Sequence, residues 1–234
     1  VEGNTTVNGV LFGGGYGQNT TISGNAVLNI LDTDQNVHIY GSGYGGSQLG
    51  RMNGNVEVNI QDIPDTPNTI SIIGFIFAGG KGNEQRAAAI SGTATINVDG
   101  SNLPEASVFG GNDINGTTSG VITVNIGETY KSTILGAYGG GNQANITTSS
   151  PGVYVYLLGN ADVTNAFNGG RAANLLSSGS ADTTRAIYLQ GGHAKNIFGG
   201  SDSSGTVTAS HVYIQSGTAE NVYGGNNVGG ITTT

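Results

Sequence analysis

The sequence predicts an all-β protein that forms a single right-handed parallel β-helix, a β-solenoid of about eight coils, over residues 1–234. Three observations predict this fold. An aromatic residue followed by a glycine-rich step recurs at intervals of 25 to 37 residues, a short strand of alternating apolar residues recurs between its copies, and the composition disfavours helices.

The composition is dominated by three small or turn-forming residue types. Glycine contributes 43 residues, asparagine 26 and threonine 25, which together make 94 of 234. Charged residues are only 9%, against about 25% in ordinary globular domains. A helical protein with charged outer faces is therefore excluded. Hydrophobic residues at 36% are enough to fill a narrow core.

The aromatic motif combines an aliphatic residue or alanine, an aromatic ring and then glycine. Its eight rings are Phe12, Tyr40, Phe77, Phe109, Tyr138, Phe167, Phe198 and Tyr223. Two consecutive apolar residues break the alternation of a strand, so we expect a corner at which both face the core. The glycines that follow are expected to supply positive φ for the bend.

The second motif is a strand with one buried face. Its copies cover residues 27–30, 56–60, 94–98, 122–126, 153–157, 187–189 and 212–214. Alternation predicts that the aliphatic residues point inward. The expected inward residues are Leu28, Ile30, Val56, Val58, Ile60, Ile96, Val98, Ile122, Val124, Ile126, Val153, Val155, Leu157, Ile187, Leu189, Val212 and Ile214.

Repeats of about 30 residues with no helical period exclude βαβ units and favour a solenoid in which each repeat is one coil. Equivalent strands of successive coils would then pair in parallel, about 4.8 Å apart. Right-handed winding is the rule for parallel crossovers. A propeller is the main competitor, but its blades usually need about 40–50 residues and four strands each.

The outward positions of this strand form two columns along the rod. One column begins as asparagine and ends as tyrosine: Asn29, Asn59, Asn97, Asn125, Tyr156, Tyr188 and Tyr213. Its neighbour reads Val27, Glu57, Thr95, Thr123, Tyr154, Ala186 and His211. Stacked asparagines are expected to hydrogen-bond from coil to coil and to hold the coils in register.

The C-terminal end of these columns is the candidate ligand-binding site. Its residues are Tyr154, Tyr156, Tyr188, Tyr213 and His211, which we call the tyrosine strip. An exposed aromatic strip on a flat sheet suits a glycan or a protein partner. The alternative is a packed cross-strand ladder, or a patch that another part of the parent protein covers.

Charge and cysteine content exclude several classes of function. The net charge is −8, with 15 acidic and 7 basic residues, so the basic patch that nucleic-acid binding needs is missing. No apolar run is long enough for membrane insertion, and no cysteine is present for disulfides or thiolate chemistry. The three histidines have no catalytic partner at a recognisable spacing. We therefore expect no enzymatic activity and no catalytic residues.

Acidic residues follow several copies of the alternating strand motif. Asp32, Asp34 and Asp62 would lie near one corner of neighbouring coils, where either a calcium ion or water must compensate their charges. The run 32–36 begins like an EF-hand loop but lacks its glycine at the sixth position and its glutamate at the twelfth. Solvation is therefore the favoured interpretation, and no cofactor is expected.

The aliphatic-aromatic-Gly-Gly step followed by a Val-x-Val-Asn-Ile strand resembles the glycine-rich β-strand-repeat regions of Gram-positive bacterial surface proteins, many of them adhesin-like. The resemblance covers nearly the whole chain and implies a pectin-lyase-like β-helix, displayed outside the cell as one piece of a larger exported protein. Its partner would be a polysaccharide, another glycan or a host surface protein.

The same fold also carries other functions. A carbohydrate-active enzyme, either a polysaccharide lyase or a glycosidase, and a passive stalk are the alternatives to an adhesin-like rod. Because the ends of a solenoid are unpaired strand edges, end-to-end self-association is a further expectation.

Overall fold

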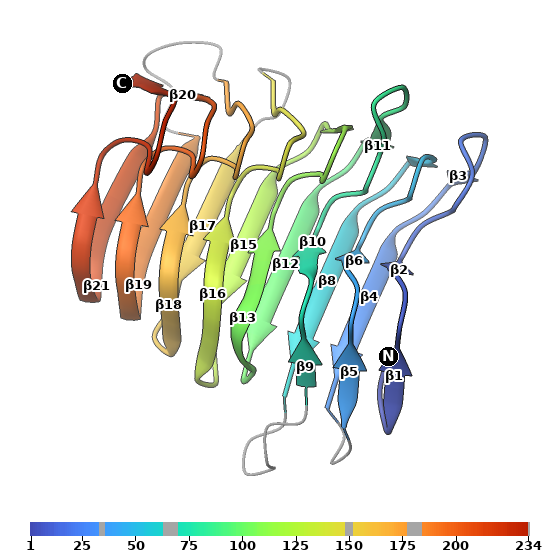
Figure 1. Ribbon diagram of the computed structural model, residues 1–234, viewed down its shortest axis with the longest axis horizontal. Coiled ribbons are helices and arrows are strands. Elements are labelled where there is room, and N and C mark those ends of the chain that lie inside the picture. Colours follow the sequence, from blue (N-terminus) through green and yellow to red (C-terminus); the bar gives the residue numbers. More distant parts are fainter. Residues whose placement is uncertain (33–35, 63–69, 148–151, 177–183, 234) are drawn as a thin grey trace.

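The computed structural model describes residues 1–32, 36–62, 70–147, 152–176 and 184–233. Within these residues every helix or strand assigned is a β-strand, and all ladders between named strands are parallel. The chain winds as a β-solenoid whose coils advance along the long axis from the N-terminal to the C-terminal end (Figure 1). The predicted all-β parallel solenoid is confirmed.

One long wall carries the alternating strand motif, and we call it the ladder wall. It consists of β4 (Ala26–Leu31), β8 (Val56–Gln61), β12 (Ala94–Asp99), β15 (Ile122–Ile126) and β17 (Val153–Leu157). Equivalent positions pair without a shift, so that Asn59 lies beside Asn97 and Val58 beside Ile96. In these strands alternate residues are buried, as the period of two predicts.

A second long wall carries the aromatic motif, and we call it the aromatic wall. It consists of β2 (Leu11–Phe12), β6 (Gly43–Tyr44), β10 (Phe75–Phe77), β13 (Asn102–Phe109), β16 (Ser132–Tyr138) and β18 (Ala161–Phe167). The long strands β19 (Arg185–Phe198) and β21 (His211–Tyr223) run through both walls. They join the two walls into one sheet of 13 strands.

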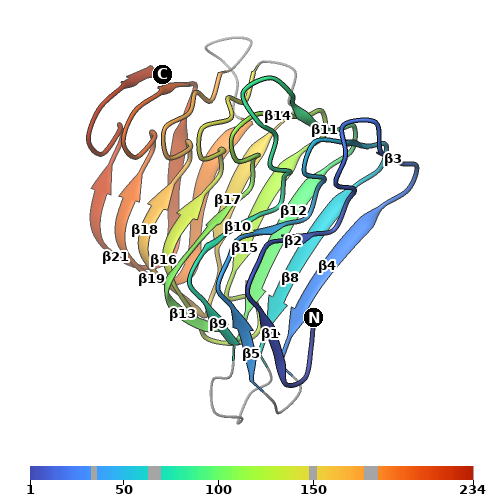
Figure 2. The ribbon, with the colours of Figure 1, turned by 45° about the vertical axis from the view of Figure 1, so that its right-hand side comes forward.

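Smaller sheets close the cross-section (Figure 2). One contains β1 (Thr5–Val7), β5 (Val37–Ile39) and β9 (Ile70–Ile72), and another contains β3 (Thr21–Ile22), β7 (Arg51–Met52), β11 (Ala88–Ile90) and β14 (Gly116–Thr118). A last pair, β20 (Thr206–Thr208) and β22 (Ile231–Thr233), lies near the C-terminal end.

The core contains a continuous stack of aromatic rings. Neighbouring rings lie 4.4 to 5.0 Å apart between centroids and are nearly parallel. The stack runs Phe12, Tyr44, Phe77, Phe109, Tyr138, Phe167, Phe198 and Tyr223. The expectation of core stacking is thus confirmed, with the aliphatic residue before the ring also buried, as at Ile76 and Phe77.

Tyr40 was the wrong ring for the second coil. It follows β5, stacks on His38 and is 54% exposed, whereas Tyr44 in β6 occupies the core position. The local sequence offers an aromatic-glycine step at both residues, and only pairing with the neighbouring coils distinguishes them. Tyr44 lies 32 residues after Phe12 and 33 before Phe77, which makes the repeat more regular.

The role of the glycines after the rings also differs from the prediction. None of Gly45, Gly110 and Gly139 has positive φ. A Cβ on Gly45 would lie 2.6 Å from the carbonyl oxygen of Ala78, in the next coil. These glycines are required because the backbones of successive coils approach too closely for a side chain, not because the bend needs a left-handed conformation.

The solenoid has about six turns, fewer than the eight coils expected. Eight rings do stack, but only the six from Tyr44 to Phe198 are buried. Phe12 and Tyr223 belong to the end coils, each of which has a neighbour on one side among the described residues. For the same reason Val212 and Ile214 of β21, expected inward, are only partly covered.

Candidate functional site

The outer face of the ladder wall carries the expected asparagine ladder. The side-chain amide of each asparagine donates through Nδ2 to the Oδ1 of the asparagine in the preceding coil. The three bonds measure 2.9 Å from Asn59 to Asn29, 2.7 Å from Asn97 to Asn59 and 2.8 Å from Asn125 to Asn97. This ladder links four coils and is confirmed as a structural feature.

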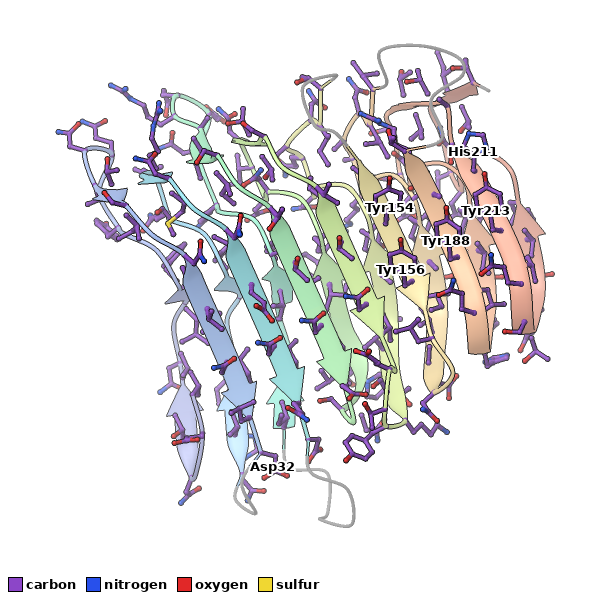
Figure 3. All side chains as sticks on the ribbon, turned by 180° about the vertical axis from the view of Figure 1, so that it is seen from behind. Asp32, Tyr154, Tyr156, Tyr188, His211 and Tyr213 are labelled. Atoms are coloured by element: carbon purple, nitrogen blue, oxygen red, sulfur yellow. The ribbon has the colours of Figure 1, made fainter. Side chains whose placement is uncertain are left out.

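The same column continues as stacked tyrosine rings. Tyr156 and Tyr188 lie 5.1 Å apart between ring centroids at an interplanar angle of 13°, and Tyr188 and Tyr213 lie 4.9 Å apart at 14°. These separations match the spacing of the coils, about 4.8 Å. Figure 3 shows the tyrosine strip at the C-terminal end of the ladder wall. The structure therefore brings together the residues that the sequence singled out.

The stacking determines which part of each ring meets solvent. Tyr188 has Tyr156 on one face and Tyr213 on the other. A partner therefore meets mainly ring edges and phenol hydroxyls, and not the broad faces on which sugar rings usually stack. Tyr213, at 36% exposed, is the most open ring of the three.

Each ring of the second column of the strip lies beside a tyrosine of the first column. Tyr154 lies 6.1 Å from Tyr156, and His211 lies 5.9 Å from Tyr213, each measured between ring centroids. Ala186 stands between them in register, and it is fully buried. Ala186 therefore offers no exposed surface to a ligand, and contact with a partner falls to the rings around it.

Burial raises the pKa of Tyr156 above its ordinary value of 10.0, with smaller contributions from the neighbouring tyrosines. Burial also raises the pKa of Tyr188, again with contributions from Tyr213 and Tyr154. Both phenols consequently stay protonated at neutral pH and keep their hydrogen-bond donors.

A second asparagine ladder, on the outer face of the aromatic wall, was missed by the sequence analysis. Asn196 donates to Asn165 over 2.9 Å, and Asn221 donates to Asn196 over 3.0 Å. Each of these asparagines stands two residues before an aromatic ring of the core stack. That fixed offset was a usable signal, but it occurs only in the last three copies of the motif.

A cluster of ionisable side chains on the aromatic wall was also missed. His193 Nδ1 lies 3.1 Å from Asp162 Oδ1, and His193 Nε2 lies 3.5 Å from Glu220 Oε1. Lys131 Nζ lies 3.5 Å from the other oxygen of Asp162. These residues come from β16, β18, β19 and β21 or their ends, so that only the coil register brings them together. All four side chains are at least one-third exposed.

The acidic corner has two buried carboxyl groups. Asp32 and Asp62 are both at least 98% buried and follow equivalent strands of adjacent coils. Asp34, the third residue proposed for calcium, lies outside the described residues. Within the described part of the chain, no group of three or more histidine, cysteine, aspartate or glutamate side chains is arranged to hold a metal ion.

A shallow groove of about 440 Å³ lies over the asparagine ladder. Its lining includes Asn29, Asn59 and Asn97, together with the carboxylates of Asp99 and Glu128. Asp99 Oδ1 accepts hydrogen bonds from the backbone amides of Thr129 and Tyr130, at 2.9 and 2.8 Å. Asp99 thus has a structural role in holding the turn that carries Glu128.

Polar groups inside the coils form hydrogen bonds with one another. The Tyr44 hydroxyl donates to Asp113 over 2.7 Å, and the Tyr138 hydroxyl donates to Asp202 over 3.2 Å. Burial and these carboxylates raise the pKa of both phenols far above 10.0. Arg185 begins β19 and is 1% exposed. Its guanidinium donates to the Leu176 carbonyl and the Thr184 hydroxyl.

The comparisons with known proteins find no matching family model, no similar curated protein and no similar solved structure. No helix among the described residues is long and apolar enough to cross a membrane.

Proposed function

We propose that this chain is a non-catalytic, right-handed β-solenoid rod of a bacterial surface protein, located outside the cell and adhesin-like in its role. The proposal rests on three ladders that run along the axis of the solenoid. One is the stack of aromatic rings in the core, and two are the asparagine ladders on the outer faces of the walls. Each ladder repeats one contact from coil to coil. Such repetition stiffens a rod along its axis, and right-handed winding follows the rule for parallel crossovers.

The proposed recognition surface is the tyrosine strip, with a glycan as its partner. Three stacked phenols present their edges in line along the rod, and Tyr154 and His211 flank them (Figure 3). Because the inner ring faces are already covered, the strip would bind mainly through hydroxyl hydrogen bonds. Sugar hydroxyls, which both donate and accept, match a row of phenols that also both donate and accept.

The test is a glycan array with an insoluble-polysaccharide pull-down. The informative variant is Y156F/Y188F/Y213F, which removes three hydroxyls and keeps the stacked rings. The matched control is Y16F/Y40F/Y130F, which removes three exposed hydroxyls outside the strip. We expect binding by the wild type and the control and loss of binding by the strip variant, with unchanged circular dichroism. Equal binding by all three proteins would refute the assignment of the site.

A passive spacer is the second candidate, because the outer tyrosines stack just as the inner core rings do. In that case the wild type binds no glycan in the same assay. The third candidate is a carbohydrate-active enzyme that would act in the groove over the asparagine ladder. Incubating each polysaccharide with the protein and measuring released sugar tests it.

We also propose that the rod associates end to end. The last coil exposes apolar residues of β21 that equivalent coils bury, with Ile214 at 48% and Val222 at 49% exposed. A further solenoid coil from a second copy would cover them and would pair with the backbone edge of β21. Light scattering over a concentration series tests this, and a monomer at all concentrations would refute it.

A further inference from the structure

The outer tyrosine column places like residues in direct contact. Tyr156, Tyr188 and Tyr213 are paired in register on adjacent strands, and their rings are 5.1 and 4.9 Å apart between centroids. They lie 32 and 25 residues apart in the sequence. All three residues are partly exposed, so the column is accessible to a reagent in solution.

The inner stack is built in the same way but never places two tyrosines together. Tyr44 lies between Phe12 and Phe77, and Tyr138 lies between Phe109 and Phe167. Their rings are buried, and their hydroxyls donate to carboxylates. Of these two ring stacks, only the outer one therefore combines neighbouring phenols with access from solvent.

We propose that Tyr156, Tyr188 and Tyr213 form an oxidative crosslinking site, at which a haem peroxidase with hydrogen peroxide joins adjacent coils through dityrosine bonds. Each of two neighbouring phenols loses one electron and one proton. The two radicals couple by a carbon–carbon bond between ortho carbons, and the two displaced ortho hydrogens return to the phenol oxygens. One hydrogen peroxide is reduced to two waters for each bond formed.

The fold favours this coupling over coupling between molecules. Radical coupling needs two phenols in contact, and the register of β17, β19 and β21 holds them in contact before the oxidant acts. A second pair of partly exposed rings, Tyr154 and Tyr156, lies within one strand at 6.1 Å and 29°. A bond there would close only a short loop, whereas bonds through Tyr188 tie three coils together.

The consequence is a covalent reinforcement of the C-terminal coils. A bond between Tyr156 and Tyr188, or between Tyr188 and Tyr213, restricts the unfolded chain in the way that a disulfide does. It also prevents the coil of β21, which pairs with β19 alone among the described strands of its sheet, from separating from the rod. This inference depends on the ring geometry alone and holds whether or not the strip binds a glycan.

The test treats the chain at low concentration with a haem peroxidase and hydrogen peroxide, isolates the monomer and measures dityrosine fluorescence. Peptide mass spectrometry then locates the bonds. We expect links between residues 156 and 188 and between residues 188 and 213, together with slower proteolysis of the treated monomer. The variant Y188F keeps a stacked ring but removes the shared partner, so monomer links through residue 188 should fall to background.

The control variant Y16F/Y40F/Y130F lacks three exposed tyrosines that stack on no other tyrosine ring among the described residues. It should form the same links as the wild type. The proposal is overturned if the wild-type monomer contains no dityrosine, or if its dityrosine is unchanged in Y188F. Failure of glycan binding would leave these readouts unaffected, so the two proposals fail separately.

Discussion

Gly139, which follows Tyr138 at the corner of the aromatic wall, tests why glycine is needed there. A Cβ at this position would lie 2.5 Å from the carbonyl oxygen of Asn168, 2.8 Å from Val153 Cγ1 and 3.2 Å from Val155 Cγ2. Because its φ is not positive, alanine fits the backbone conformation and conflicts only with the surroundings. The change Gly139→Ala therefore isolates close packing between coils.

The expected magnitude combines two opposing effects. Replacing glycine by alanine at a compatible φ stabilises a protein by about 0.4–1 kcal/mol, through a lower entropy of the unfolded chain. Inserting a methyl group into a close-packed interior costs about 1–3 kcal/mol. The carbonyl oxygen of Asn168 belongs to the backbone and cannot rotate away, so the cost should dominate. We expect Gly139→Ala to lower the free energy of unfolding by roughly 1–2 kcal/mol.

Gly24→Ala is the matched control, since nothing lies within 4 Å of a Cβ at Gly24 and its φ is also not positive. It should leave the free energy of unfolding unchanged or raise it by up to about 1 kcal/mol. Urea unfolding followed by circular dichroism measures both variants. The reasoning is wrong if Gly139→Ala is as stable as Gly24→Ala, because the coils would then separate at the corner without cost.

Three further predictions concern the ladders. Phe109→Ala removes a buried ring and should cost about 3–5 kcal/mol in urea unfolding. Phe109→Leu should cost about 1–3 kcal/mol, mainly for the ring contacts with Phe77, Tyr138 and Phe75; equal costs would contradict the stacking argument. Asn97→Leu breaks the side-chain hydrogen bonds to Asn59, Asn125 and Glu57 and should cost about 1–3 kcal/mol. Asn221→Leu breaks one such hydrogen bond at the exposed end and should cost less; thermal unfolding compares the two variants. The pKa values of Tyr44 and Tyr138 are raised, so the folded chain keeps two phenol protons that the unfolded chain loses above pH 10. The free energy of unfolding should therefore fall as the pH rises above 10. In urea titrations over a pH series, Y44F/Y138F should flatten that decline.

The strands of the ladder wall could be predicted from the sequence because their signal is local. Alternation within five or six residues determines which side chains face the core, as in Val56, Val58 and Ile60. The asparagine ladder followed from the same alternation once the copies were aligned. The alignment of Tyr156, Tyr188 and Tyr213 in one column followed for the same reason. The stacking of their rings, which the sequence left as an alternative to open ring faces, is decided only by the structure.

The features that the sequence did not predict depend on the register between neighbouring coils. Short segments of sequence do not determine that register. Tyr40 and Tyr44 both precede glycine, and the core position is decided by pairing with Phe12 and Phe77. The contact of His193 with Asp162 joins residues 31 apart, and nothing in either segment marks it. The glycine corners were misassigned because a need for positive φ and a need for close approach select the same residue.

The two asparagine ladders explain how the outer tyrosine column can exist without loosening the rod. The asparagine ladder of the ladder wall ends at Asn125. The asparagine ladder of the aromatic wall begins at Asn165, in the coil that also contains Tyr156, the first tyrosine of the outer column. The last coils thus have an amide ladder of their own and the inner ring stack as well. Register in these coils does not require the tyrosine hydroxyls. Their removal by Tyr→Phe therefore tests surface chemistry, and a loss of glycan binding in such variants would report the site itself rather than a damaged fold.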